Sequence, residues 1–111
     1  MNDKLAVILV SADPDVLDMG LIYAVNVVNR QWIPDLRVYL FGPSEVTIVT
    51  HPELAERIKM LIKAGIVPEA CIDCSDKHNV TEPLRELGCI VRGIGQPVTE
   101  AIREGYVPMS W

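Results

Sequence analysis

The sequence predicts a three-layer α/β/α sandwich built around a mostly parallel five-stranded sheet. Short apolar runs rich in β-branched residues show no alternation of polar and apolar positions, which is typical of strands buried on both faces. These runs alternate with helical segments through short connections, a pattern that predicts parallel strands with helices on both faces of the sheet. At 111 residues, we expect one domain that spans residues 1–111.

The first two predicted strands lie at residues 4–10 and 36–42, on either side of a long helix. The run KLAVILV is continuously apolar, as is most of LRVYLFG, which a Gly-Pro pair ends. Asp13 is a residue type that caps helices, and a proline follows it at the first helical position. The helix at 15–30 is apolar around most of its circumference. We therefore expect it to lie deep, against the sheet or against another subunit.

The middle of the chain predicts a helix at 52–64 and leaves the segment before it open. The β-branched residues of SEVTIV, at 44–49, suit a strand, whereas its position suits a helical turn or a loop. The next four residues, THPE, have the pattern of a capping box, in which Thr50 caps the helix and Glu53 reaches back to its amide. An apolar stripe follows one face of the helix, and Gly65 ends it.

The last part of the chain predicts three further strands and two helices. A strand at IVPEACID leads to a short helix around EPLREL, and a strand at CIVRGIG leads to a helix at PVTEAIRE. The fifth strand is YVPM, and Pro108 confines it to an edge of the sheet because proline cannot donate a ladder hydrogen bond.

Composition excludes several classes of protein. Half of the residues are hydrophobic, which is too apolar for a disordered chain. A formal net charge of -5 without any basic run argues against nucleic acid as a partner. No apolar stretch is long enough to span a bilayer, so we expect no membrane association. The first apolar run lacks the flanks of a signal peptide. We therefore expect a cytoplasmic protein whose three cysteines are thiols rather than disulfides.

Ligands of parallel α/β sheets bind outside the carboxyl ends of the strands. Four segments are predicted to meet at that edge: SADPD, FGPS, CIDCSDKH and RGIGQP. Their turns present backbone amides that can bind an anionic group. The candidate binding residues are Ser11, Asp13, Gly42, Gly93 and Gly95.

The pair Cys71 and Cys74 leaves several interpretations open. As a redox pair the two thiols must meet, which requires a turn that begins near Asp73, because side chains along a continuing strand alternate between its faces. With His78 and Cys89 they make up the donor types of a zinc site. Cys71 can instead act alone as a nucleophile. All three cysteines can also be small buried hydrophobes, the interpretation we favour for Cys89. We expect no metal and no cofactor.

The order of these features resembles the DsrE/DsrF-like sulfur-relay family, whose members include subunits of tRNA-thiolation and sulfur-oxidation relays. An apolar first strand leads to an aspartate-rich turn and a helix that ends YAVNVVNR, and a second strand ends at FG. The stretch IVPEACIDCSDKHNV follows a helix that stops at Gly65. Residues 64–71 carry most of the resemblance, and they place Cys71 at the position of the family's cysteine.

The resemblance implies that Cys71 accepts sulfur as a persulfide and passes it to a partner protein, so that an active protein would be sulfurtransferase-like. Cys74 stands where a small polar residue is more usual, and as a resolving thiol it would release sulfide by closing a disulfide. We expect Cys71 to face a crevice between the loops after the first and fourth strands. The resemblance also implies a homo-oligomer, with a trimer favoured over a hexamer.

Two other functions remain open. One is a non-catalytic oligomeric module that binds a small ligand or a protein at the same edge of the sheet. The other is a dithiol redox protein that uses Cys71 and Cys74. Exposure of the Cys71 sulfur separates the sulfur carrier from the binding module, because sulfur transfer needs an accessible thiolate.

Overall fold

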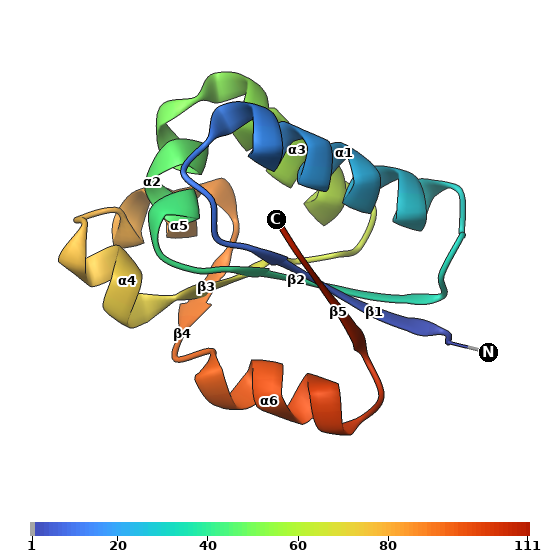
Figure 1. Ribbon diagram of the computed structural model, residues 1–111. Helices are drawn as coiled ribbons and strands as arrows, with labels where there is room; N and C mark the ends of the chain where they lie inside the picture. Colours follow the sequence, from blue (N-terminus) through green and yellow to red (C-terminus); the bar gives the residue numbers. More distant parts are fainter. Residues whose placement is uncertain (1) are drawn as a thin grey trace.

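The computed structural model describes residues 2–111 and has the predicted α/β sandwich fold (Figure 1). Five strands form an all-parallel sheet in the order β4-β3-β2-β1-β5. Their bounds are β1 (Lys4–Leu9), β2 (Asp35–Leu40), β3 (Glu69–Cys71), β4 (Ile90–Arg92) and β5 (Val107–Ser110). The last strand pairs only with β1, which confirms that the strand containing Pro108 is an edge strand.

Six helices connect the described strands: α1 (Pro14–Asn29), α2 (Pro43–Thr50), α3 (Pro52–Lys63), α4 (Ile72–Lys77), α5 (Thr81–Leu87) and α6 (Gly95–Arg103). Figure 1 shows α1, α2, α3 and α5 over one face of the sheet and α6 alone under the other, with α4 at the carboxyl end of β3. None of these helices, within residues 2–111, combines the length and the apolar character that crossing a bilayer requires.

The chain changes face after β4. From β1 to β4 it moves stepwise across the sheet, and α6 then returns along the opposite face to place β5 beside β1. The connections that leave the carboxyl ends of the neighbouring strands β3 and β4 therefore diverge. In open parallel sheets such a divergence creates the crevice in which ligands bind.

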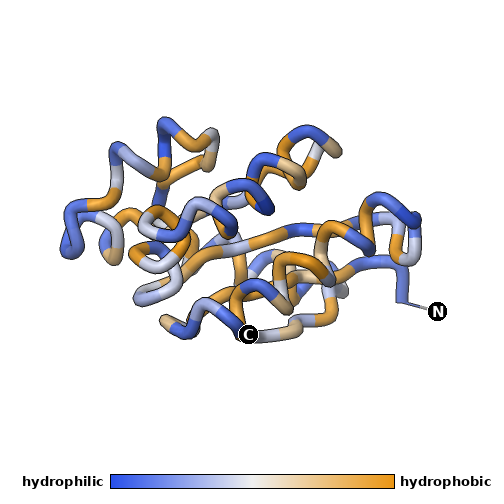
Figure 2. The backbone as a smooth tube through the Cα atoms, turned by 90° about the horizontal axis from the view of Figure 1, so that it is seen from above, coloured by the Kyte–Doolittle hydropathy of each residue, from blue (hydrophilic) through white to orange (hydrophobic). Residues whose placement is uncertain are grey.

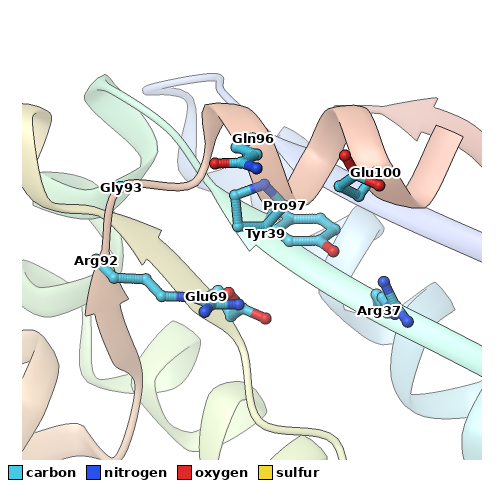
Figure 3. Close-up of a pocket in the computed structure, with 8 residues that line it drawn as sticks. All are labelled: Arg37, Tyr39, Glu69, Arg92, Gly93, Gln96, Pro97 and Glu100. Carbon is cyan, nitrogen blue, oxygen red and sulfur yellow. Dashed lines mark hydrogen bonds and ion pairs between the residues drawn. The ribbon is translucent and has the colours of Figure 1, made fainter. Parts of the chain in front are cut away.

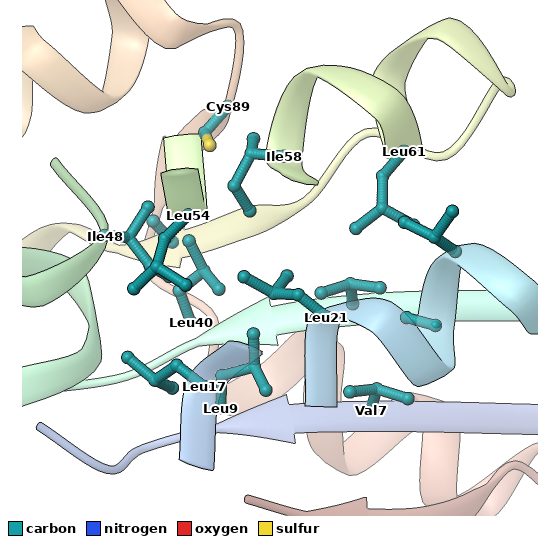
Figure 4. Close-up of a cluster of buried hydrophobic side chains, with 14 of the residues drawn as sticks. Val7, Leu9, Leu17, Leu21, Leu40, Ile48, Leu54, Ile58, Leu61 and Cys89 are labelled. Atoms are coloured by element: carbon teal, nitrogen blue, oxygen red, sulfur yellow. The ribbon is translucent and has the colours of Figure 1, made fainter. Parts of the chain in front are cut away.

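The two faces of the sheet carry cores of different size. The larger core lies between the sheet and the helices α1 and α3 (Figure 4), with Leu9, Leu21, Leu40 and Ile58 fully buried. Burial of each such side chain contributes about 1.5–3 kcal/mol to folding. The smaller core lies between the sheet and α6. It consists of Ala6, Tyr39, Ile94, Ala101 and Tyr106. Along the helices hydrophilic and hydrophobic residues alternate, as expected for helices with one buried side (Figure 2).

The third strand is shorter than predicted. Its pairing with β2 and β4 covers only Glu69–Cys71, so it ends two residues before the predicted end at Asp73, and α4 begins at Ile72. The helical turn is held by the Ser75 hydroxyl, which donates to the Ile72 carbonyl at 3.1 Å and lies 2.7 Å from the Thr81 hydroxyl of α5. This early turn decides where the two neighbouring cysteines point.

The predicted capping box at Thr50 is wrong. The open segment at 44–49 is helical and forms most of α2, and Thr50 is the last residue of that helix. Its hydroxyl donates to the Val46 carbonyl at 2.8 Å, so it is not free to cap α3. Burial of Thr47 and Ile48 in α2 outweighs the strand preference of these β-branched residues.

Candidate functional site

Cys71 lies at the carboxyl end of β3, between the ends of β2 and β4. Its partner in the register is Arg92 of β4, and its half-buried side chain packs against the small core under α6. The prediction of a crevice between the first and fourth strand loops is wrong, because β2 lies between β1 and β3. The loops that flank Cys71 are those after β2 and β4.

The Cys71 and Cys74 thiols lie together. Cys71 is the residue directly before α4, with an extended backbone, and Cys74 lies in the first turn of that helix. Because the turn begins at Ile72, the two side chains do not alternate across a strand, and the Cys71 side chain lies close enough to raise the pKa of the Cys74 thiol. The Gly42 backbone amide, just after β2, acts on the pKa of the same thiol in the opposite direction. The structure thus brings Cys71, Cys74 and Gly42 into one cluster.

A buried glutamate completes this cluster. Glu45 lies in the first turn of α2 and is 0% exposed. Neither carboxylate oxygen has a well-formed hydrogen-bond partner, although the Cys71 backbone amide favours the charged form. Burial is the dominant effect and raises the pKa of Glu45 to about 7.

The thiols of Cys74 and Cys89 both have raised pKa values, which favours their protonated form. Burial, the Cys71 side chain and the Glu45 charge raise the pKa of Cys74, and the Gly42 amide only partly offsets them. Burial raises the pKa of Cys89 to about 12, with a further contribution from Glu45. Cys89 is 6% exposed and belongs to the larger core, on the sheet face opposite to the Cys71 side chain. Cys89 therefore packs as a hydrophobe, whereas the other two cysteines lie at the sheet edge.

A cleft of about 610 Å³ opens on the α6 face of the sheet, lined by neighbours of Cys71 on β3 and β4 but not by Cys71 itself (Figure 3). Glu69 and Arg92 line it and form an ion pair at 2.7 Å. They lie on the same side of the sheet as Cys71, because side chains two residues apart on a strand share a face and paired positions align. The other lining residues are Arg37, Tyr39, Gly93, Gln96, Pro97 and Glu100. Both charge signs are present, so the cleft suits a polar group more than a bare anion.

Of the other predicted binding residues, Gly93 and Gly95 lie near the cleft, whereas Ser11 and Asp13 do not. The Ser11 hydroxyl accepts the Asp13 amide at 3.0 Å, and Asp13 caps α1 by accepting the amides of Asp15 and Val16. These groups are used locally, and β2 separates their loop from Cys71. Gly93 lines the cleft, and Gly95 is the first residue of α6.

The structure does not assemble the zinc ligands. The His78 imidazole lies in a hydrogen bond with the Cys74 carbonyl at 2.9 Å, and Cys89 faces the larger core. Within residues 2–111, no three His, Cys, Asp or Glu side chains gather as metal ligands would. The cysteine pair therefore has the geometry of a dithiol.

Three residues of this region were missed by sequence reasoning. Glu45 resembles any acidic residue in the first turn of a helix, and nothing local indicates its burial. Arg92 is far from Cys71 in the sequence, and only the pairing of β3 with β4 places the two residues side by side. Tyr39 lies in an apolar strand, and its buried hydroxyl has no partner. These residues come together because of the order of the strands in the sheet. The spacing of residues along the sequence does not reveal that order.

Neither protein-family models nor curated proteins match this chain, whereas solved structures do. A conserved protein of unknown function from Bacteroides thetaiotaomicron, BT1422, is 31% identical, with a TM-score of 0.90 over 98% of this chain and 95% of that one. YchN from E. coli superposes at a TM-score of 0.80, with 16% identity over the whole of both chains. MTH1491 from Methanobacterium thermoautotrophicum, of unknown function, has a TM-score of 0.70 and 16% identity, covering 98% and 100% of the two chains.

Proposed function

The chain belongs to the same family as BT1422, and we propose that it carries sulfane sulfur as a persulfide on Cys71 and passes it to a partner protein in the cytoplasm. The observation that carries this proposal is the half-exposed Cys71 at the carboxyl edge of the sheet, in contact with the second thiol of Cys74. The resemblance to the DsrE/DsrF-like sulfur-relay family supports it. YchN, which has a DsrE/DsrF-like fold, shares this architecture.

The reaction requires only groups that the site has. The Cys71 thiolate attacks the outer sulfur of a persulfide donor, the donor's S–S bond breaks, and the donor leaves as a thiol. The sulfane sulfur is then bound to Cys71 and can be transferred to an acceptor thiol in the same way. The cleft lined by Arg92 and Glu69 lies on the same face of the sheet as Cys71, and we expect a donor or acceptor to bind there.

The test is the intact mass of the protein after incubation with glutathione persulfide and removal of the excess. We expect the Cys74→Ala variant to gain the mass of one sulfur atom, because the resolving thiol is absent and the persulfide remains. We expect Cys71→Ala to gain none. The Cys89→Ala variant is the control for loss of a cysteine away from the site, and it should load like the wild type. Equal loading of Cys71→Ala and Cys74→Ala would refute the proposal.

Dithiol redox chemistry is a second candidate, favoured by the contact between the Cys71 and Cys74 side chains. In this reaction a disulfide oxidant accepts two electrons and leaves as two thiols, while a Cys71–Cys74 disulfide forms. Equilibration of the protein with mixtures of reduced and oxidised glutathione separates the two functions. A carrier without redox function loads sulfur from the persulfide but remains a dithiol in those mixtures.

We also propose that the protein is a homo-oligomer, with a trimer favoured by the family resemblance. Met19 and Trp32 are 63% and 56% exposed. The Trp32 ring lies next to Tyr23, which in turn lies next to the partly buried Trp111, so a row of aromatic rings leads from the core to the exposed Trp32. Such a surface favours contact with another subunit.

Light scattering at micromolar concentration is expected to give the mass of a trimer for the wild type. Met19→Glu should shift the mass toward the monomer, because a charge would have to be buried in the contact. The matched control is Ile102→Glu, an exposed apolar residue of α6 on the opposite face of the sheet. A monomer mass for the wild type would contradict this proposal.

A further inference from the structure

We propose that Glu45 is the proton acceptor for Cys74 when Cys74 resolves the persulfide on Cys71. This inference rests on the proposed sulfur-carrier function and assigns a role to a residue that the carrier step itself does not use. Its basis is one fully buried carboxyl group, without a well-formed hydrogen bond, on a helix that packs against α4, the helix that contains Cys74.

The burial of Glu45 requires an explanation because it is unfavourable. A buried carboxylate is normally paired with a cation or fully hydrogen-bonded, and Glu45 has neither. The two neighbouring buried polar side chains of α2 are satisfied: Ser44 donates to the Leu9 and Phe41 carbonyls, and Thr47 donates to the Ala12 carbonyl. Structural needs of the helix therefore account for Ser44 and Thr47 but not for Glu45.

The groups that interact electrostatically with Glu45 belong to cysteines. Its helix packs against α1, α3, α4 and α5, and the only group that favours its charged form, within residues 2–111, is the Cys71 backbone amide. The Glu45 charge in turn acts on two thiols, Cys74 of α4 and Cys89 ahead of β4. Cys89 is locked in the core, so Cys74 is the thiol with which Glu45 can exchange a proton during a reaction.

Charge conservation lowers the free-energy cost of this exchange. With Glu45 ionised and Cys74 protonated, the pair carries one negative charge, and it carries the same charge after the proton has moved from sulfur to oxygen. Ionisation of Cys74 beside an already charged Glu45 would instead place two negative charges in one buried region. With burial raising its pKa to about 7, Glu45 is also in the range where a general base works best at neutral pH.

The proposed step is balanced within the protein. Glu45 takes the Cys74 proton, and the Cys74 thiolate attacks the Cys71 sulfur. The bond between the two cysteines forms, the bond to the sulfane sulfur breaks, and that sulfur leaves as hydrosulfide. Two cysteine sulfurs are oxidised to a disulfide and the sulfane sulfur is reduced to sulfide. A dithiol reductant then restores the two thiols, and the protonated Glu45 can return the proton to Cys74.

The test is the rate of sulfide release from protein loaded with glutathione persulfide, measured with Glu45→Gln over a pH range from about 5 to about 9. In the wild type we expect the rate to rise with ionisation of Glu45 and to level off above about pH 7. In Glu45→Gln we expect that rise to disappear and the rate at pH 7 to fall by about 100-fold. Ser44→Ala, the equally buried neighbour, should keep the wild-type pH profile. An unchanged pH profile in Glu45→Gln overturns the inference.

A second measurement does not depend on sulfur loading. In a Cys71→Ala background, the rate of Cys74 alkylation by iodoacetamide reports the Cys74 thiolate as a function of pH. Removal of the Glu45 charge by Glu45→Gln should move this titration to lower pH, and no movement overturns the inference. Failure of Cys74→Ala to load any sulfur on Cys71 would instead refute the carrier function, and this titration would still decide whether Glu45 and Cys74 share a proton.

Discussion

Glu45→Gln is expected to change the pH dependence of folding stability by about 3 kcal/mol, because the pKa of Glu45 rises from 4.5 in the unfolded chain to about 7 in the fold. Below about pH 4 the carboxyl group is protonated in both states, and it contributes no pH dependence. As the pH rises toward 7 the unfolded chain loses this proton while the folded chain keeps it, so wild-type stability falls. Above about pH 7 the loss is complete and constant.

Denaturant unfolding of both proteins at about pH 4 and about pH 8 measures this effect. The comparison between the two pH values cancels any constant difference in the packing of the amide and the carboxyl group. Relative to wild type, Glu45→Gln should therefore become more stable by about 3 kcal/mol at the higher pH. The control is Glu53→Gln, an exposed residue in the first turn of α3, which retains Glu45 and should follow the wild-type curve. Parallel stabilities of wild type and Glu45→Gln would show that Glu45 does not titrate as a buried group.

This cost in stability and the proposed chemistry belong together. A buried and poorly paired carboxyl group lowers the stability of the fold above neutral pH, whereas an amide in its place would not. The same burial gives Glu45 a proton affinity suited to a thiol partner at neutral pH. Residues that break local rules of stability without compensation are most often found at functional sites. The stability measurement and the sulfide-release measurement therefore probe two consequences of one feature.

The order of elements could be predicted from sequence because it rests on strong local signals. The apolar runs at β1 and β2 have no alternative to burial on both faces, and they appear within a residue or two of the predicted bounds. Gly88 ends α5 with a φ of 109°, a conformation that favours glycine. The end of the third predicted strand placed Cys71 near the carboxyl edge of the sheet, where the structure also has it.

The remainder depends on contacts between distant parts of the chain. The short β3 follows from how much of it finds partners on β2 and β4, and spacing along the sequence contains no information about that. The meeting of Cys71 and Cys74 follows from this early end, and the burial of Glu45 follows from the packing of α2 over the same edge. The cleft combines residues of three strands and one helix that no local pattern connects.

Gly20→Val is expected to destabilise the fold by about 2–3 kcal/mol through overpacking. Gly20 lies inside α1, where glycine is unfavourable by about 1 kcal/mol relative to alanine and the sequence offers no reason for it. The structure supplies the reason. A Cβ atom at this position would lie 2.7 Å from Cγ of Trp111 and 3.0 Å from Cδ2 of Leu9. The indole thus occupies the space that a side chain would need.

Trp111 cannot move away easily, because hydrogen bonds anchor its backbone to the end of β1. Its amide donates to the Ile8 carbonyl at 2.8 Å, and its carbonyl accepts the amides of Val10 and Ser11 at 2.8 and 3.1 Å. A side chain at position 20 must therefore displace the ring from its contact with Tyr23 or break this anchor. Either change loosens the attachment of β5 to the sheet.

A double-mutant cycle with Trp111→Ala tests this explanation directly. Once the indole is absent, Gly20→Val should cost less, with a coupling energy of at least about 1 kcal/mol between the two positions. Met19→Val on the exposed side of the same helix measures the cost of a β-branched residue alone, which is expected to stay below about 1 kcal/mol. Additive effects of Gly20→Val and Trp111→Ala in denaturant unfolding would rule out the clash. The cost at Gly20 would then come from helix propensity or from Leu9, and the C-terminal residue would have no part in holding α1 against the sheet.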